Sequence, residues 1–310
     1  MQHETTLEKI YDKVDVMSAN CIDHNVNVPE IEFDSLDLIR ISGESHIVRP
    51  VAQRSLSNRL GIPYHYLKKC PKELQRDNLQ HWIKHEKAEQ LFFRFDGEDK
   101  EVRAIFSTRY KPVDNFEVMF QLDSMGFKPE TKVQCSIDPE FMSLSIPDGK
   151  QSFSINGDKF TPGISISNSE VGLASLSISA FIWRLICSNG LISKTQESSS
   201  YRHVSTKILE EFPDVLEKVS LELGNKKEMF RLSMDSSVDN PDSTMESFNR
   251  QFQLNEKERE AVSWGWCFDV GESMFHILNA YTKASQFEGL SAESCFKLQK
   301  TGGNILAMVK

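Results

Sequence analysis

The chain has 310 residues, of which 39% are apolar and 10% aromatic, and its net charge is −9. This composition indicates a folded protein of one or two domains with a sizeable core, and it excludes a disordered chain. No apolar run approaches the roughly 18 residues of a membrane helix, and the charged first residues are unlike a secretory signal. We therefore expect a cytoplasmic protein with no membrane association.

The chain begins with an acidic segment, residues 1–48, in which we expect a short helix, a polar linker and one or two short strands. A helix is predicted over residues 50–60, closed by Gly61. Another is predicted over 71–86, with Pro71 near its start and an apolar stripe along one side. On that helix His81 and His85 could share a face, since they are four residues apart, but two solvated histidines are the favoured interpretation.

A sheet is predicted in the middle of the chain, because apolar and polar residues alternate with a period of two. Residues 91–95 and 102–107 flank a turn-rich link and predict a hairpin. A helix over 115–126 ends at Gly126. Further strands are predicted at 132–137, 141–146, 151–155, 163–167 and 175–188.

The segments 204–234 and 243–300 are predicted to be mainly helical. The sequence thus predicts an α+β fold, with an antiparallel sheet core at about residues 88–190, a helical N-terminal segment and a mainly helical C-terminal part. We expect three regions: an acidic segment 1–48, an α+β core 49–203 and a helical part 204–310.

Charge is unevenly distributed along the chain. Residues 49–111, which we call the basic island, carry 14 Lys and Arg against 8 Asp and Glu. The local field governs encounter with a polyanion, so the overall negative charge does not exclude one. Arginine and lysine would contact phosphates and tyrosines would stack on bases. The predicted contacts are Arg49, Arg54, Arg59, Tyr64, Tyr66, Lys68, Lys69, Arg94, Arg103, Arg109, Tyr110 and Lys111. The alternative for Arg109 is a strand-end turn in which it pairs with an acidic neighbour.

A dense polar motif lies in residues 162–190, and its candidate residues, with one downstream histidine, are Asn168, Ser169, Glu170, Arg184, Asn189 and His203. The cluster at 168–170 could be a turn tied by its own side chains, a binding site, or a catalytic site with Glu170 as a base or metal ligand. Arg184 stands in an apolar run and needs a carboxylate partner if it is buried. We expect that partner to be Glu170.

Two further features of this region have both a structural and a functional interpretation. Cys187 could be a nucleophile activated by His203, or a buried structural thiol. Serines alternate with aliphatic residues along the predicted strands, at 143, 145, 165, 167, 175, 177 and 179. They would line one sheet face, which would either be solvated or allow close approach by a ligand or another subunit.

Several common catalytic signatures are absent from the sequence. There is no GxxxxGK[ST], no GxGxxG and no paired-carboxylate nuclease motif, which argues against an NTPase or a dinucleotide enzyme. The six cysteines form no CxxC pair, and the histidines form no HExxH or HxH pattern. We therefore predict no catalytic residues, no cofactor and no metal.

Several segments resemble, in their order along the chain, a family known as domain of unknown function 932, often labelled phage/plasmid-like protein. The matching segments are LGIPYHYL (60–67), VRAIFSTRYKPVDN (102–115), PGISISNSEVG (162–172), RLICSNGL (184–191), RH (202–203) and LNAYT (278–282). The family carries no established reaction. The resemblance implies a phage or mobile-element setting, in which proteins of DNA replication and recombination are common.

The favoured hypothesis is a non-enzymatic protein that binds single-stranded DNA during recombination or annealing, acting as a homo-oligomer. One alternative is a protein–protein interaction module, such as an inhibitor of host defence or an accessory protein with a host partner. Another is an enzyme acting on nucleotides through Glu170, Arg184 and His203.

Overall fold

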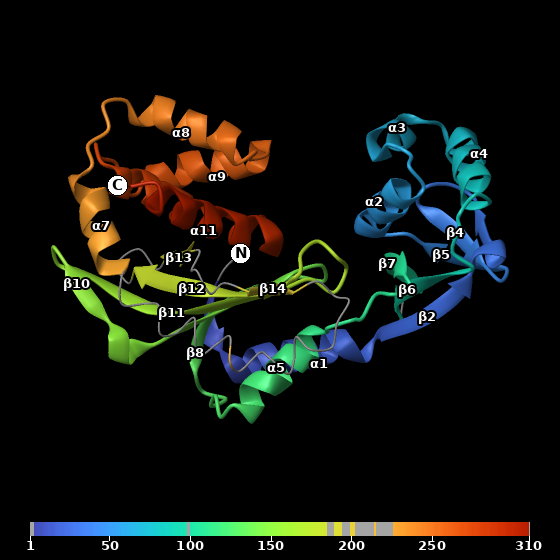
Figure 1. The fold of residues 1–310 in the computed structure, drawn as a ribbon, viewed down its shortest axis with the longest axis horizontal. Coiled ribbons are helices and arrows are strands. Elements are labelled where there is room, and N and C mark those ends of the chain that lie inside the picture. The colour runs from blue at the N-terminus through green and yellow to red at the C-terminus, as the bar shows by residue number, and fades with distance from the viewer. Residues whose placement is uncertain are drawn as a thin grey trace.

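The computed structural model describes residues 3–97, 100–184, 189–193, 199–201, 214 and 226–309. Its strands and helices are arranged in two bodies that lie side by side (Figure 1). One body is built on a large sheet with helices on both sides. The other contains two small sheets and three helices from the first third of the chain.

The large sheet is antiparallel throughout and follows the order β1-β8-β9-β11-β12-β13, with β10 on β11 and β14 on β12. Its strands are β1 (His3–Thr6), β8 (Lys132–Ile137), β9 (Met142–Pro147), β10 (Phe153–Ile155), β11 (Asp158–Asn168), β12 (Leu176–Arg184), β13 (Asn189–Ser193) and β14 (Ser199–Tyr201). Apolar residues alternate with polar ones along these strands, and the apolar ones point to one face of the sheet. Leu144 of β9, Ile166 of β11 and Ile178 of β12 are buried there in one core cluster.

Two groups of helices lie on opposite sides of the large sheet (Figure 1). Helices α1 (Leu7–Ala19) and α5 (Asn115–Ser124) pack together on one side. The C-terminal helices lie on the other side, and they are α7 (Lys226–Asp235), α8 (Pro241–Gln251), α9 (Glu256–Trp266), α10 (Met274–Ala284) and α11 (Ala292–Leu306). Leu7, Ile10 and Val14 form the buried face of α1, at the spacing of an amphipathic helix.

The second body has its own hydrophobic core, which includes Leu67, Leu79 and Phe93. Its first sheet has the order β2-β6-β7 and its second the order β3-β4-β5. The elements are β2 (Cys21–Asn27), β3 (Ile31–Phe33), β4 (Leu38–Ile41), β5 (Glu44–Ile47), α2 (Pro50–Arg59), α3 (Tyr64–Lys69), α4 (Lys72–Ile83), β6 (Gln90–Asp96) and β7 (Glu101–Ser107). Single 3-10 turns lie at Val28–Glu30 and Gly149–Gln151.

The α+β class with antiparallel sheets is confirmed. The predicted hairpin also forms, as β6 and β7, but it pairs with β2 rather than with the large sheet. The large sheet instead takes its edge strand β1 from the start of the chain. His81 lies in the last turn of α4 and His85 two residues beyond its end, with ring centroids 4.8 Å apart. No helix in the described ranges is long and apolar enough to cross a bilayer.

The interpretation of the serine face as a solvated surface is wrong for the serines of β9 and β11, whereas Ser175, Ser177 and Ser179 are half-buried. Ser143, Ser145, Ser165 and Ser167 are all buried. The side chain of Ser145 donates to that of Ser165 at 3.1 Å, and Ser167 and Ser177 share a hydrogen bond of 2.8 Å. Each of these pairs lies directly opposite across two strands, so the hydroxyls of each pair satisfy one another.

Candidate functional site

A buried ionic network joins the two bodies. Arg94 on β6 and Arg103 on β7 are 1% and 3% exposed, and both reach Glu170, which follows β11 of the large sheet. We call Asp23, Arg94, Arg103, Asp114 and Glu170 the junction network. Charges this deeply buried persist only when each has a well-placed partner.

Glu170 is held through all three of its oxygens. Its Oε2 accepts from Nη2 of Arg103 at 3.0 Å, and its Oε1 accepts from the backbone N–H of Asn115 at 2.8 Å. Its carbonyl oxygen accepts from Nη1 of Arg94 at 3.2 Å and from the hydroxyl of Tyr110 at 3.4 Å. The side chain is 6% exposed, so the carboxylate is committed to contacts within the chain.

Arg94 completes the network with two carboxylates. Its Nε lies 3.0 Å from Oδ1 of Asp23 on β2, and its Nη2 lies 2.7 Å from Oδ1 of Asp114, just before α5. Burial by itself disfavours the charged guanidinium, but Asp114 and Asp23 outweigh that effect and raise the pKa of Arg94. Burial also raises the pKa of Tyr110, which keeps its hydroxyl protonated as a donor.

The rest of the polar cluster also ties segments together. Nδ2 of Asn168 donates to the carbonyl of Val113 at 2.9 Å and to Oδ1 of Asn115 at 3.0 Å. The hydroxyl of Ser169 donates to the carbonyl of Glu140 at 2.7 Å and accepts from the N–H of Leu173 at 3.1 Å. Only the bond from Leu173 is local, as expected for a turn tied by its own side chains; the others tie residues 168 and 169 to segments far away in the sequence.

The predicted pair of Arg184 with Glu170 is wrong. Arg184 instead lies 2.6 Å from carboxylate oxygens of both Asp158 and Asp269, and its guanidinium sits 4.7 Å from the ring centroid of Phe275. In the antiparallel pairing of β11 with β12, Arg184 faces Phe160, whereas Glu170 lies beyond the far end of β11. The nine residues from Phe160 to Asn168 span roughly 26 Å of strand.

The remaining residues of the motif are Asn189 and His203. Asn189 begins β13, where its backbone lies opposite Arg184. His203 and Cys187 lie outside the described residues. The structure therefore brings together Asn168, Ser169 and Glu170 and separates Arg184 from them.

Four arginines of the predicted contact set are engaged with carboxylates of the same chain. Besides Arg94 and Arg103, Arg49 contacts Asp96 at 2.8 Å and Glu101 at 2.5 Å, and Arg59 contacts Glu86 at 2.7 Å. A phosphate cannot reach the two buried arginines unless the junction network opens. Much of the positive charge in residues 49–111 is therefore internal charge matching.

The remaining cations of the predicted set are exposed, and within the described ranges none forms an ion pair; they are Arg54, Lys68, Lys69, Arg109 and Lys111. Helices α2 and α3 carry three of them beside two tyrosines. We call Arg54, Tyr64, Tyr66, Lys68 and Lys69 the α2–α3 face. The guanidinium of Arg54 lies 5.7 Å from the ring centroid of Tyr64, and Tyr66 is 48% exposed.

Tyr110 does not present a free ring for stacking. Its ring is stacked on that of Phe106, with centroids 3.8 Å apart and planes inclined by 4°. One face of the ring is therefore already covered, and its hydroxyl is bound to the Glu170 carbonyl.

Sequence reasoning missed the partners Asp23 and Asp114 and the burial of Arg94 and Arg103. The signal for the arginines was present, because each stands within an apolar strand, as Arg184 does. Asp114 also carried a signal, because an aspartate followed three residues later by a glutamate is the pattern of a helix-capping box. In the structure Glu117 accepts a hydrogen bond from the backbone N–H of Asp114 at 2.9 Å. Nothing local indicated Asp23, which becomes a partner only through the pairing of β2 with β6.

A family model matches residues 102–284, more than half of the chain. The chain belongs to the family described as Domain of unknown function (DUF932). The matched stretch contains Arg103, Glu170 and Arg184, whereas Asp23, Arg94 and the α2–α3 face lie before it. Neither a curated protein nor a solved structure matches this chain.

Proposed function

We propose that this DUF932 protein binds single-stranded nucleic acid without catalysing a reaction on it, in recombination or annealing of mobile-element DNA. The observation that supports the proposal is the α2–α3 face. There Arg54, Lys68 and Lys69 are exposed and form no direct ion pair in the described part of the chain, next to the exposed ring of Tyr66. Within the described ranges only Arg54 of the three lies close enough to carboxyls, those of Glu140 and Glu293, to act on them through its charge. Phosphate contacts from cations and base stacking on an aromatic ring are the two parts of sequence-independent single-strand binding.

The geometry gives less support to an enzyme built on Glu170, Arg184 and His203. Both carboxylate oxygens of Glu170 are occupied by donors of the same chain, and Arg184 belongs to a different ion cluster. A general base must have an oxygen within reach of the proton that it removes. Glu170 has no such oxygen while the junction network is closed.

A face with three cations gives only modest affinity for one stretch of nucleic acid. Several copies on one strand would multiply the contacts, and avidity would then supply tight binding. We therefore propose that the working form is a homo-oligomer. Arg109 and Lys111 are also exposed and provide further phosphate contacts.

The test is fluorescence anisotropy of a labelled mixed-sequence DNA of about 30 nucleotides, titrated between about 50 and 200 mM salt. Removing three phosphate contacts should lower the slope of log affinity against log salt by about 2. The variant Arg54→Gln, Lys68→Gln, Lys69→Gln removes the cations. The matched control Lys128→Gln, Lys150→Gln, Lys159→Gln neutralises three exposed lysines of the other body.

We expect the first variant to lose at least about tenfold in affinity with the reduced slope, and the control to bind as the unaltered protein does. Absence of binding by the unaltered protein at the lowest salt would overturn the proposal. Equal losses in the two triple variants would show that the α2–α3 face is not the contact surface.

A further inference from the structure

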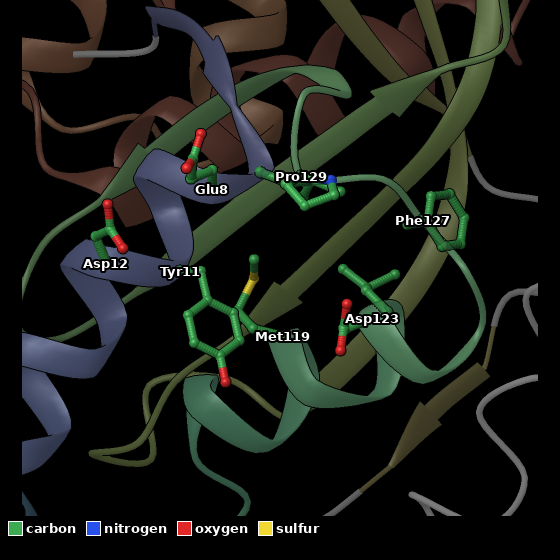
Figure 2. Close-up of a pocket in the computed structure, with 9 residues that line it drawn as sticks. Glu8, Tyr11, Asp12, Met119, Asp123, Phe127 and Pro129 are labelled. Carbon is green, nitrogen blue, oxygen red and sulfur yellow. The ribbon is translucent and has the colours of Figure 1, made fainter.

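Helices α1 and α5 lie on the side of the large sheet away from the C-terminal helices (Figure 1). A pocket of about 260 Å³ opens between these two helices. Its floor and walls are apolar and come from Leu7, Tyr11, Met119, Leu122, Phe127 and Pro129. Figure 2 shows the ring of Tyr11 and the side chain of Met119 next to each other, one from each helix. The pocket is thus a gap between two helices, lined by side chains that can hold an apolar group.

Three carboxylates and no cation complete the lining. Glu8 and Asp12 come from α1 and Asp123 from α5. All three are exposed, and among the described residues none of them forms an ion pair or a hydrogen bond through its side chain. An apolar pocket whose lining carries negative charge and no cation is complementary to an apolar group that carries positive charge beside it.

Apolar surface continues past the pocket along both helices. Phe120, three residues before Asp123 on α5, is 54% exposed, and Val16, one turn after Asp12 on α1, is 67% exposed. Phe116 extends the wall, with its ring centroid 5.4 Å from that of Tyr11. A small molecule that filled the pocket would leave Phe120 and Val16 uncovered, whereas an extended partner would cover them.

We propose that the groove between α1 and α5 is a docking site for a basic, amphipathic segment of a partner polypeptide. One large apolar side chain of that segment enters the pocket against Tyr11 and Met119. Lysine or arginine side chains next to it reach Glu8, Asp12 and Asp123, and the rest of its apolar face covers Phe120. This is the helix-in-groove mode of recognition, in which apolar anchors repeat at helical spacing.

This site is separate from the α2–α3 face in both position and charge. The three carboxylates repel phosphate, so nucleic acid is excluded from the groove that the basic segment occupies. The two ligands can therefore bind one molecule at the same time. The inference does not depend on the proposed nucleic-acid binding, and each can fail without the other.

The experiment uses the full chain labelled with ¹³C at the methionine methyl groups, and a helical peptide of about 14 residues with leucines at helical anchor spacing and lysines elsewhere. Met119 lines the pocket, so its methyl signal reports occupancy, and Met125 on the same side provides a reference. Two control peptides are used: a scrambled one of the same composition, and one with glutamate in place of lysine. Affinity is measured in parallel by titration calorimetry.

We expect the lysine peptide to shift the Met119 signal saturably and the two control peptides to leave it unmoved. The double variant Asp12→Asn with Asp123→Asn should lower the affinity for the lysine peptide by about tenfold or more. The matched control, Asp235→Asn with Asp239→Asn, neutralises two exposed carboxylates at and just after the end of α7, on the other side of the large sheet, and should bind normally. Since the altered residues are exposed, these variants are expected to fold.

Four outcomes would overturn the inference. The scrambled peptide could bind equally well, which would show unspecific attraction. The experiment could also show that none of the peptides shifts the Met119 signal at about 1 mM. Phenethylammonium alone could match the peptide's affinity, which would make the pocket a small-molecule site. The protein could instead self-associate in a way that Asp123→Asn abolishes, which would make a second copy the occupant.

Discussion

Nη2 of Arg103 lies 3.0 Å from Oε2 of Glu170, and both side chains are almost fully buried between the two bodies of the protein. Arg103 also donates to the carbonyl of Pro139 at 3.0 Å and contacts the thiol of Cys21. One arginine thus connects β7, the segment after β11, the loop before β9 and the start of β2.

Arg103→Met should lower the free energy of unfolding by roughly 3–5 kcal/mol, because it leaves the Glu170 carboxylate buried without its cation. Urea denaturation measures the change. The matched control is Arg40→Met, which breaks contacts of 3.2 Å with Glu32 and Asp34 on the surface. That change should cost no more than about 1 kcal/mol. Similar losses in both variants would contradict a structural role for the buried pair.

Double-mutant cycles should separate the true ion pair from the one that the sequence suggested. Arg103→Met and Glu170→Gln should show a coupling energy of roughly 1–3 kcal/mol, because they share a contact. Arg184→Met and Glu170→Gln should be additive to within about 0.5 kcal/mol, because no partner is shared. A large coupling between Arg184 and Glu170 would conflict with the observed strand register.

Tyr66→Ala should weaken single-stranded DNA binding by about 1–3 kcal/mol, because it removes a stacking surface. It should leave the salt dependence of binding unchanged, since it removes no charge. Anisotropy titrations at several salt concentrations measure both quantities. Tyr110→Phe serves as the comparison: it keeps the ring that stacks on Phe106 and should bind DNA normally. A change in salt slope with Tyr66→Ala would indicate that the residue acts through the lysines.

The buried thiol of Cys135 should lower the stability of the protein at alkaline pH. Burial raises the pKa of its thiol from 9.0 to about 12. Above pH 9.0 the unfolded thiol loses its proton and the folded one keeps it, so the folded state binds more protons. The free energy of unfolding should therefore fall as pH rises, by up to about 1.4 kcal/mol per pH unit from this group.

The measurement compares the unaltered protein with Cys135→Ala by urea denaturation from pH 9 to 10. Tyr110 and Tyr281, whose pKa values are also raised by burial, contribute above this interval in both proteins. We expect a smaller fall in the variant. Parallel curves would show that the thiol does not titrate differently in the two states.

Gly163 should not tolerate a side chain. A Cβ placed there would lie 2.1 Å from the carbonyl oxygen of Ile146 on β9, a contact with backbone that cannot move aside. Gly163→Ala should therefore destabilise the protein by roughly 1–3 kcal/mol. Gly149→Ala, where a Cβ would meet nothing within 4 Å, should have little effect. Thermal unfolding of the two variants compares them directly.

Local signals in the sequence were sufficient to predict most of the strands and helices. The period-two alternation identified β9, β11 and β12, and Gly126, with φ of +83°, ended the helix where the sequence predicted. These signals depend on residues close in the chain, whose spacing fixes which face of a strand or helix is apolar. The α+β class followed from them.

Only the tertiary structure decided which charges meet. Glu170 is 14 residues from Arg184 and 67 from Arg103 along the chain, yet the antiparallel register of β11 with β12 carries Arg184 to the opposite end of the sheet. Pairing of β2 with β6 likewise brings Asp23 to Arg94 across 71 residues. An arginine within an apolar strand predicts, from the sequence alone, that a carboxylate will lie against it. Strand order and register decide which carboxylate comes within a few ångströms of that arginine, and a direct ion pair forms only over such a distance.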